Sequence, residues 1–107
     1  MDRYKKENSF APILENPVIL DFAGCSYLGQ IHQILKEKLG FPEYYGGNWD
    51  ALWDCMDGLF DARDELTIEI HGFLGLEKQL RDGCRPMLEI FDEIHKISPQ
   101  VKFSLLS

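Results

Sequence analysis

The chain has 107 residues, of which 45% are hydrophobic and 27% charged, a composition typical of one globular domain rather than of a disordered chain. Its net charge is −7, which argues against direct binding to nucleic acid or to an anionic membrane, since both attract basic surfaces. A basic partner, or solubility alone, fits this charge better.

The three cysteines are an odd number and include no CxxC pair, and each lies among or beside apolar residues. They are therefore expected to be buried, reduced thiols. The polar first residues predict no signal peptide, and no apolar run approaches the length of a membrane span. Together these features predict a cytoplasmic protein.

The first part of the chain predicts an arm, a strand and a helix. Residues 1–16 are polar and lack periodicity, so we expect a flexible arm. The apolar and β-branched run Pro17–Phe22 predicts a buried strand. Apolar residues then recur at helical spacing over Tyr27–Leu39, with Ser26 as the expected N-cap and a glycine as the stop.

A loop rich in tyrosine and glycine leads to a second helix, which we expect to run from its N-cap Asn48 to about Phe60. Four aspartates in this segment are spaced i, i+4, i+7 and i+11, which at about 100° per residue places them within about 40° of arc. These four are Asp50, Asp54, Asp57 and Asp61. The residues expected on the opposite side are Leu52, Cys55, Met56 and Leu59, with Trp53 at the border.

The second part of the chain predicts a strand, two helices and a strand. Apolar and polar residues alternate over Leu66–His71, which predicts a strand with one apolar face. A short helix is predicted over Gly72–Leu80, and Asp82-Gly83 indicates a turn. The strongest amphipathic pattern, Met87 to Ile97, predicts a longer helix that tolerates a proline in its first turn. Val101–Leu106 predicts the last strand.

The order of strand, two helices, strand, two helices and strand predicts a small α/β domain over residues 17–107. Strands separated by helical connections are normally parallel, with right-handed crossovers. We therefore expect a three-stranded parallel sheet packed by about four helices. The apolar helix faces must cover this sheet, because no other core is available.

The stretch Phe41–Asp61 (FPEYYGGNWDALWDCMDGLFD) is the strongest candidate for a functional surface. It contains five carboxylates, both tryptophans and two adjacent tyrosines, but no Lys, Arg or His. Like charges at i, i+4 destabilise a helix by roughly 0.2–0.5 kcal/mol per pair. A solvated face is one interpretation of such a run. The flanking aromatic residues, which are typical of interface anchors, favour a surface for a cationic partner.

Other chemistries find little support in the sequence. The carboxylates lack EF-hand spacing, and His32, His71 and His95 are dispersed, so we expect surface histidines rather than metal ligands or catalytic bases. No nucleophile elbow is present, and the acids after Gly46-Gly47 would repel a phosphate. A paired-carboxylate hydrolase is an alternative, but a chain of this size has little room for a cleft. We therefore expect no enzymatic activity, no metal and no cofactor.

The run PEYYGGNWDALWDCMDGLF, followed by LEIFDEIHK and VKFSLLS, resembles the barstar family of intracellular inhibitors of the secreted bacterial ribonuclease barnase. The likeness covers about Pro17 to Ser107. It implies a parallel three-stranded sheet packed by helices, with an inhibitory surface on the second helix and the loop before it. The residues at the family's contact positions are Tyr44, Tyr45, Gly46, Asn48, Trp49, Asp50, Trp53, Asp54, Asp57, Gly58, Ile90 and Glu93.

The resemblance also implies a mechanism, in which Asp54 matches the aspartate that enters the phosphate site of the nuclease. A ribonuclease gathers cationic side chains to hold phosphate, so a carboxylate on a rigid helix can occupy the same pocket. The surrounding acids would speed the encounter. The expected partner is a basic ribonuclease of barnase type, bound one to one by a monomer. The alternative is a non-inhibitory module that binds another basic protein through the same face.

The sequence departs from the family pattern at three positions. Leu59 stands where the family has an aromatic residue, Asp57 where it has a small polar residue, and Gly47 where it has an acid. These departures bear on the identity of the partner and on the affinity for it.

Overall fold

The computed structural model describes residue 13 and residues 15–60 and 65–106. Most of the predicted arm therefore lies outside the described residues, as does Asp61. The described elements, in chain order, are β1 (Val18–Asp21), α2 (Leu28–Leu39), α3 (Trp49–Phe60), β2 (Leu66–His71), α4 (Lys78–Gly83), α5 (Arg85–Ile97) and β3 (Val101–Leu105). The predicted α/β class and element order are confirmed, with three longer helices and the short α4.

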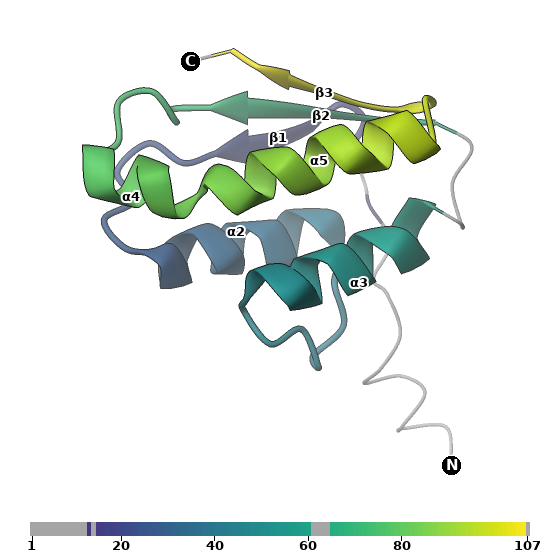
Figure 1. The fold of residues 1–107 in the computed structure, drawn as a ribbon, viewed down its shortest axis with the longest axis horizontal. Helices are drawn as coiled ribbons and strands as arrows, with labels where there is room; N and C mark the ends of the chain where they lie inside the picture. The colour runs from purple at the N-terminus through teal and green to yellow at the C-terminus, as the bar shows by residue number, and fades with distance from the viewer. Residues whose placement is uncertain (1–12, 14, 61–64, 107) are drawn as a thin grey trace.

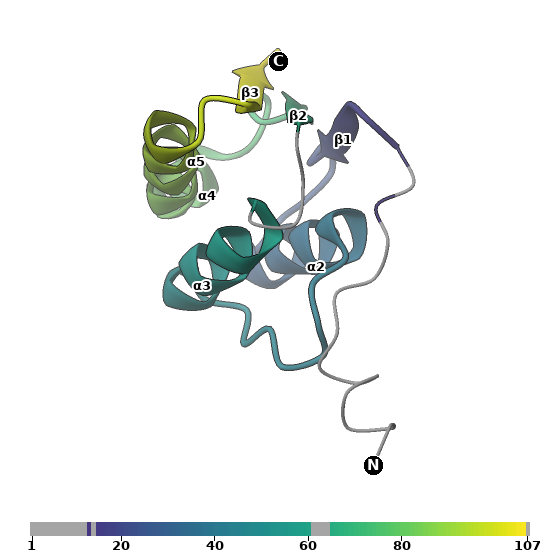
Figure 2. The ribbon, with the colours of Figure 1, turned by 90° about the vertical axis from the view of Figure 1, so that its right-hand side faces the viewer.

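The three strands form one parallel sheet in the order β1-β2-β3, as predicted for strands joined by helices. Val18 pairs with Ile68, and Leu66 pairs with Val101. Each connection steps to the next strand in the same direction, and right-handed crossovers of this kind place both pairs of helices on one face. Figures 1 and 2 show this arrangement, with the labelled helices on the same side of the sheet.

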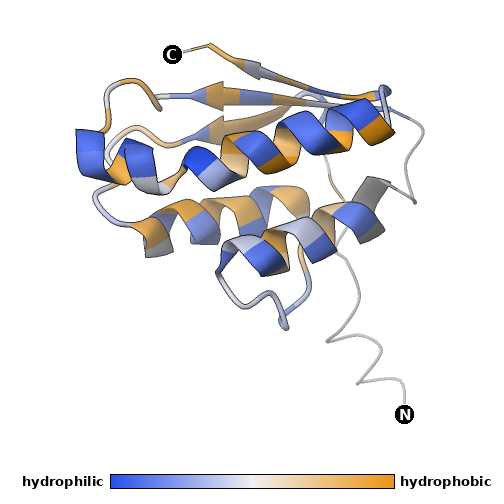
Figure 3. Ribbon diagram, viewed as in Figure 1, coloured by the Kyte–Doolittle hydropathy of each residue, from blue (hydrophilic) through white to orange (hydrophobic). Residues whose placement is uncertain are grey.

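The core lies between this face of the sheet and the helices. Leu66, Ile68 and Ile70 of β2 are fully buried, whereas the intervening residues of the strand are only half-buried. The apolar stripes of α2, α3 and α5 close the core from the other side. Figure 3 shows the corresponding alternation of apolar and polar colour along β2 and around α5. The predicted covering of the sheet by helices is thus confirmed.

The start of α2 differs from the prediction. Its N-cap is Tyr27, which makes no side-chain cap hydrogen bond, so the assignment of Ser26 as the cap is wrong. The backbone N–H of Ser26 instead donates to the side-chain oxygen of Gln30 at 2.6 Å. A side chain of the helix thus satisfies a backbone donor of the segment before it. The glycine stop is confirmed at Gly40, whose φ of 67° is left-handed.

The short helix predicted over Gly72–Leu80 has the wrong bounds. Helix α4 begins only at Lys78, and the predicted turn at Asp82-Gly83 forms its end. Three apolar residues suggested the earlier start: Phe73, Leu76 and Leu80. All three are buried, the first two in an irregular segment and the third in the first turn of α4. Their spacing therefore predicted burial correctly but not helical structure.

Two smaller differences concern the ends of the chain's elements. Ile97, counted on the apolar face of α5, is 56% exposed, because it is the final residue of the helix and lies beyond the last buried position, Ile94. Of the predicted arm, Glu15 pairs with Lys38 at 3.1 Å, and the side chain of Asn16 accepts the Thr67 N–H at 3.0 Å. The described end of the arm is thus attached to the domain.

Candidate functional site

The start of α3 is fixed by Asn48, as the sequence predicts. The Asn48 side-chain oxygen accepts the backbone N–H of Ala51 at 2.8 Å, and its carbonyl accepts the N–H of Leu52 at 3.0 Å. This cap satisfies one of the free donors at the helix start. It also fixes the residue at which the helix begins.

The predicted division of α3 into two faces is confirmed for the described side chains. Leu52, Cys55 and Met56 are at most 2% exposed and anchor the helix in the core. On the other side, three aspartates are exposed and form what we call the acidic face: Asp50, Asp54 and Asp57. Among the ion pairs between described residues, none involves an aspartate of the acidic face. Their negative charge is therefore not neutralised by the described part of the chain.

A groove of about 270 Å³ runs between α3 and α5 next to the acidic face. We call it the α3–α5 groove. It brings together five of the predicted contact residues from two segments distant in sequence: Trp49, Asp50, Trp53, Ile90 and Glu93. Both tryptophans are half-buried, so each ring is held by the core on one side and available on the other.

Two further residues line the α3–α5 groove, Pro86 and Glu89. The sequence reasoning missed both of them. Glu89 lies one helical turn before Glu93, and this i, i+4 spacing was the signal that could have found it. Its side chain gives the groove a third acid beside Asp50 and Glu93.

One acid of the groove has a cationic neighbour that the sequence reasoning did not identify. The Lys96 ammonium lies 3.8 Å from the Glu93 carboxylate and 3.3 Å from that of Asp92. All three side chains are more than half exposed. The negative charge at this end of the α3–α5 groove is therefore partly offset.

The loop before α3 presents some of its predicted contact residues to solvent. Tyr44 is 58% exposed, and Gly46 and Asn48 are exposed as well. Tyr45 differs, because it is only 8% exposed and its ring packs 4.9 Å from that of Phe41, centroid to centroid. Burial raises the pKa of the Tyr45 hydroxyl, which therefore stays protonated. Contact between Tyr45 and a partner stays a prediction, since the ring offers little surface here.

The expectation that His32 is a surface histidine is wrong. It is 7% exposed on α2, its Nδ1 is hydrogen-bonded to the hydroxyl of Tyr45, and its ring centroid lies 4.2 Å from that of Trp49. Burial lowers the pKa of this imidazole below its usual value. The other two histidines differ, since His95 is exposed and His71 is half-buried.

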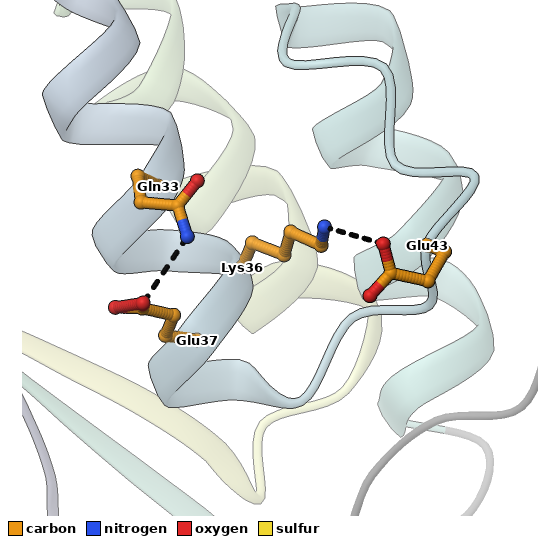
Figure 4. A network of polar contacts seen from close by, with 4 residues as sticks. All are labelled: Gln33, Lys36, Glu37 and Glu43. Atoms are coloured by element: carbon orange, nitrogen blue, oxygen red, sulfur yellow. Dashed lines mark hydrogen bonds and ion pairs between the residues drawn. The ribbon is translucent and has the colours of Figure 1, made fainter. Parts of the chain in front are cut away.

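The acidic stretch is less isolated in space than in sequence. Glu43, in the loop, pairs with Lys36 of α2 at 3.1 Å, as Figure 4 shows. The unpaired negative charge is thus found on α3 rather than on the loop. Gly58 belongs to the last turns of α3, but side chains from residue 58 to the end of that helix lie outside the described residues, including that of Leu59.

The described part of the chain offers neither a metal site nor a membrane span. No group of three or more His, Cys, Asp or Glu residues within it could hold a metal ion. No helix within it combines the length and the apolar character needed to cross a bilayer. Its cysteines are free thiols, with Cys55 and Cys84 buried and Cys25 half-buried.

Comparison with known proteins identifies the family. The model of the family described as "Barstar (barnase inhibitor)" matches residues 16–106, which is most of the chain. A protein of Bacillus subtilis (strain 168) named "Putative ribonuclease inhibitor YrdF" is 37% identical over 76 residues, covering 71% of this chain and 81% of that protein. The family match includes α3, the loop before it and the sheet that supports them in the fold described above. The chain therefore belongs to the barstar family.

Proposed function

We propose that this protein inhibits a basic ribonuclease by covering its active site with α3 and the loop before it. The observation that carries the proposal is the acidic face, whose Asp50, Asp54 and Asp57 are exposed on one side of a helix that is anchored in the core on the other. The family match and the name of the Bacillus relative support a ribonuclease inhibitor in general. The barnase-type target and the mechanism are our proposals.

Asp54 is the central aspartate of the acidic face, and in our proposal it occupies the phosphate site of the nuclease. Its helix is held by Leu52 and Met56, both fully buried, so the carboxylate is presented on a rigid support. Binding then requires little ordering of the inhibitor, which favours affinity. Charge-assisted hydrogen bonds from the cationic side chains of the nuclease would fix the carboxylate in place.

The α3–α5 groove supplies the second part of the proposed interface. Trp49 and Trp53 offer large, partly buried rings, and such rings often dominate binding energy when a partner covers them. The acids around them attract a basic surface over longer distances and raise the rate of encounter. An apolar centre with an acidic rim therefore suits a cationic protein better than a free anion or a nucleic acid.

We further propose that one molecule of this protein binds one molecule of nuclease in the cytoplasm. The acidic face, the loop and the α3–α5 groove form adjoining parts of one surface, which supports the binding of one partner there. In the cytoplasm such an inhibitor would protect cellular RNA from a nuclease destined for secretion.

Titration of barnase with this protein tests the proposal, with the rate of RNA cleavage as the readout. The rate should fall in proportion to added protein and reach zero near one equivalent. Cleavage that continues undiminished at a large excess of the protein would refute inhibition of a barnase-type nuclease. Binding without loss of cleavage would instead favour a non-inhibitory module that uses the same face.

A further inference from the structure

The loop between α2 and α3 runs back along α2 and contacts it at two polar points. Glu43 pairs with Lys36 at 3.1 Å, and the hydroxyl of Tyr45 hydrogen-bonds with Nδ1 of His32. Lys36 and His32 are one helical turn apart, so they lie on the same side of α2. As the chain moves forward from Glu43 to Tyr45, its contacts therefore move backward along the helix.

Figure 4 shows the first of these contacts in detail. The side chain of Lys36 reaches across to Glu43 on the loop, while Glu37 accepts a hydrogen bond of 3.1 Å from Gln33 within α2. Lys36 is 25% exposed, whereas Glu43 is 76% exposed. The ion pair is therefore open to water on the loop side, and by itself contributes little to the loop's position.

Apolar packing leaves part of the loop unsupported. A hollow of about 220 Å³ lies between α2 and the loop, lined by His32 and Lys36 on one side and by Tyr45, Gly46 and Gly47 on the other. The two glycines have no side chain to fill it, and the φ of Gly47 is 69°, where other residues are strained. The loop is therefore held at Tyr45, whose ring packs on Phe41 and whose hydroxyl makes the buried contact with His32.

His32 also reaches past the loop to the functional helix. Its ring centroid lies 4.2 Å from that of Trp49, the first residue of α3 and a lining residue of the α3–α5 groove. One buried imidazole thus contacts both the loop and the helix start, although α2 itself contributes nothing to the acidic face. This contact was not apparent from the sequence, where His32 lies outside the acidic stretch.

We propose that His32 is a positioning residue, which holds Tyr45 and Trp49 in fixed relation and so sets the shape of the loop and first turn of α3 offered to the partner. Lys36 is a weaker, second tether of the same loop. The effect on binding rests on the proposed function, whereas the effect on the loop is a property of the unbound protein. The two can therefore be measured separately.

Two variants remove the contact and keep an aromatic ring at the position, and a third is their control. Tyr45→Phe removes only the hydroxyl, and His32→Phe keeps a ring beside Trp49 but removes the hydrogen-bonding nitrogen. Tyr27→Phe is the matched control, because it also removes a tyrosine hydroxyl but at a side chain that is 61% exposed at the start of α2. The double variant of His32 and Tyr45 tests whether the two side chains act through one shared hydrogen bond.

Hydrogen exchange in the unbound protein gives the first readout. The backbone N–H of Tyr45 donates to the carbonyl of Pro42 at 3.0 Å and therefore reports the order of the loop. Tyr45→Phe and His32→Phe should speed its exchange, while the amides of β2 exchange as in the unaltered protein. Faster exchange throughout the molecule would indicate a merely structural role for His32 and would overturn the proposal, as would unchanged exchange at Tyr45.

Affinity for barnase gives the second readout. Each single variant should weaken binding by about two- to tenfold, the range expected for one hydrogen bond. The double variant should bind barnase with an affinity no lower than that of the weaker-binding single variant. Tyr27→Phe should bind as the unaltered protein does. Additive losses would overturn the shared contact. If the unaltered protein does not bind barnase, the proposed function fails for that target, and the exchange measurement still decides the role of His32.

Discussion

Lys96 should weaken the attraction between this protein and a basic partner, so its removal is expected to strengthen binding. Its ammonium lies 3.8 Å from Glu93 in the α3–α5 groove and 3.3 Å from Asp92. A cationic partner must therefore approach a surface that already carries a positive charge. The variant Lys96→Met removes that charge and keeps a long apolar side chain.

The size of the effect follows from distance and exposure. The three side chains are 58–64% exposed, so their ion pairs contribute no more than about 1 kcal/mol to folding, and the variant should fold normally. Two unit charges 4 Å apart in water interact by about 1 kcal/mol, and salt screens this interaction. We therefore expect binding to tighten by about two- to fivefold at low ionic strength, mostly through faster association.

Stopped-flow association with barnase at low and high ionic strength measures this effect. The control is Lys102→Met, which removes an equal charge from an exposed residue of β3 on the face of the sheet away from the helices. Lys96→Met should speed association more than Lys102→Met does at low salt, and the difference should disappear at high salt. Equal effects of the two variants would refute the reasoning, because net charge rather than position would then explain them.

The remaining predictions concern stability and the cysteines. Asn48→Ala should lower the free energy of unfolding in urea by about 1 kcal/mol, whereas Asn48→Ser, which keeps a capping oxygen, should cost less; equal losses would contradict the cap. Because burial lowers the pKa of His32, the unfolded chain binds a proton first as the pH falls. Stability should therefore decrease below about pH 6.5 and level off below the lowered pKa, and His32→Phe should lose this part of the pH dependence in urea titrations. Burial raises the pKa of the Cys55 thiol, and that of Cys84 to about 11, so mass spectrometry should find both alkylated only after unfolding; rapid labelling of the native protein would contradict their burial.

Features governed by local periodicity were predictable from the sequence. The bounds of β2 follow from strict alternation over Leu66–His71, and α3 follows from the Asn48 cap and an apolar face of helical period. The order of strands and helices was enough to predict a parallel sheet with a helical layer. The same periodicity placed Asp50, Asp54 and Asp57 on one exposed face.

Features that depend on contacts between distant segments were not predictable in this way. His32 is buried against Tyr45 and Trp49, which come thirteen or more positions later in the chain, and no local pattern indicates that contact. The pairing of Lys36 with Glu43 likewise depends on how the loop lies against α2, and the place of Glu89 in the α3–α5 groove depends on how the helices pack. The start of α4 was misplaced because an irregular segment can bury side chains at helical spacing.

The role of Asp54 is the central claim, and the inhibition constant for barnase of a charge-neutralised variant tests it most directly. Asp54→Asn keeps the shape of the side chain, and Glu77→Gln, which removes the same charge from an exposed residue before α4, is the matched control. If Asp54 occupies the phosphate site, its neutralisation should weaken inhibition by at least about 30-fold, while Glu77→Gln changes it little. Inhibition by Asp54→Asn as strong as that by Glu77→Gln would contradict the account.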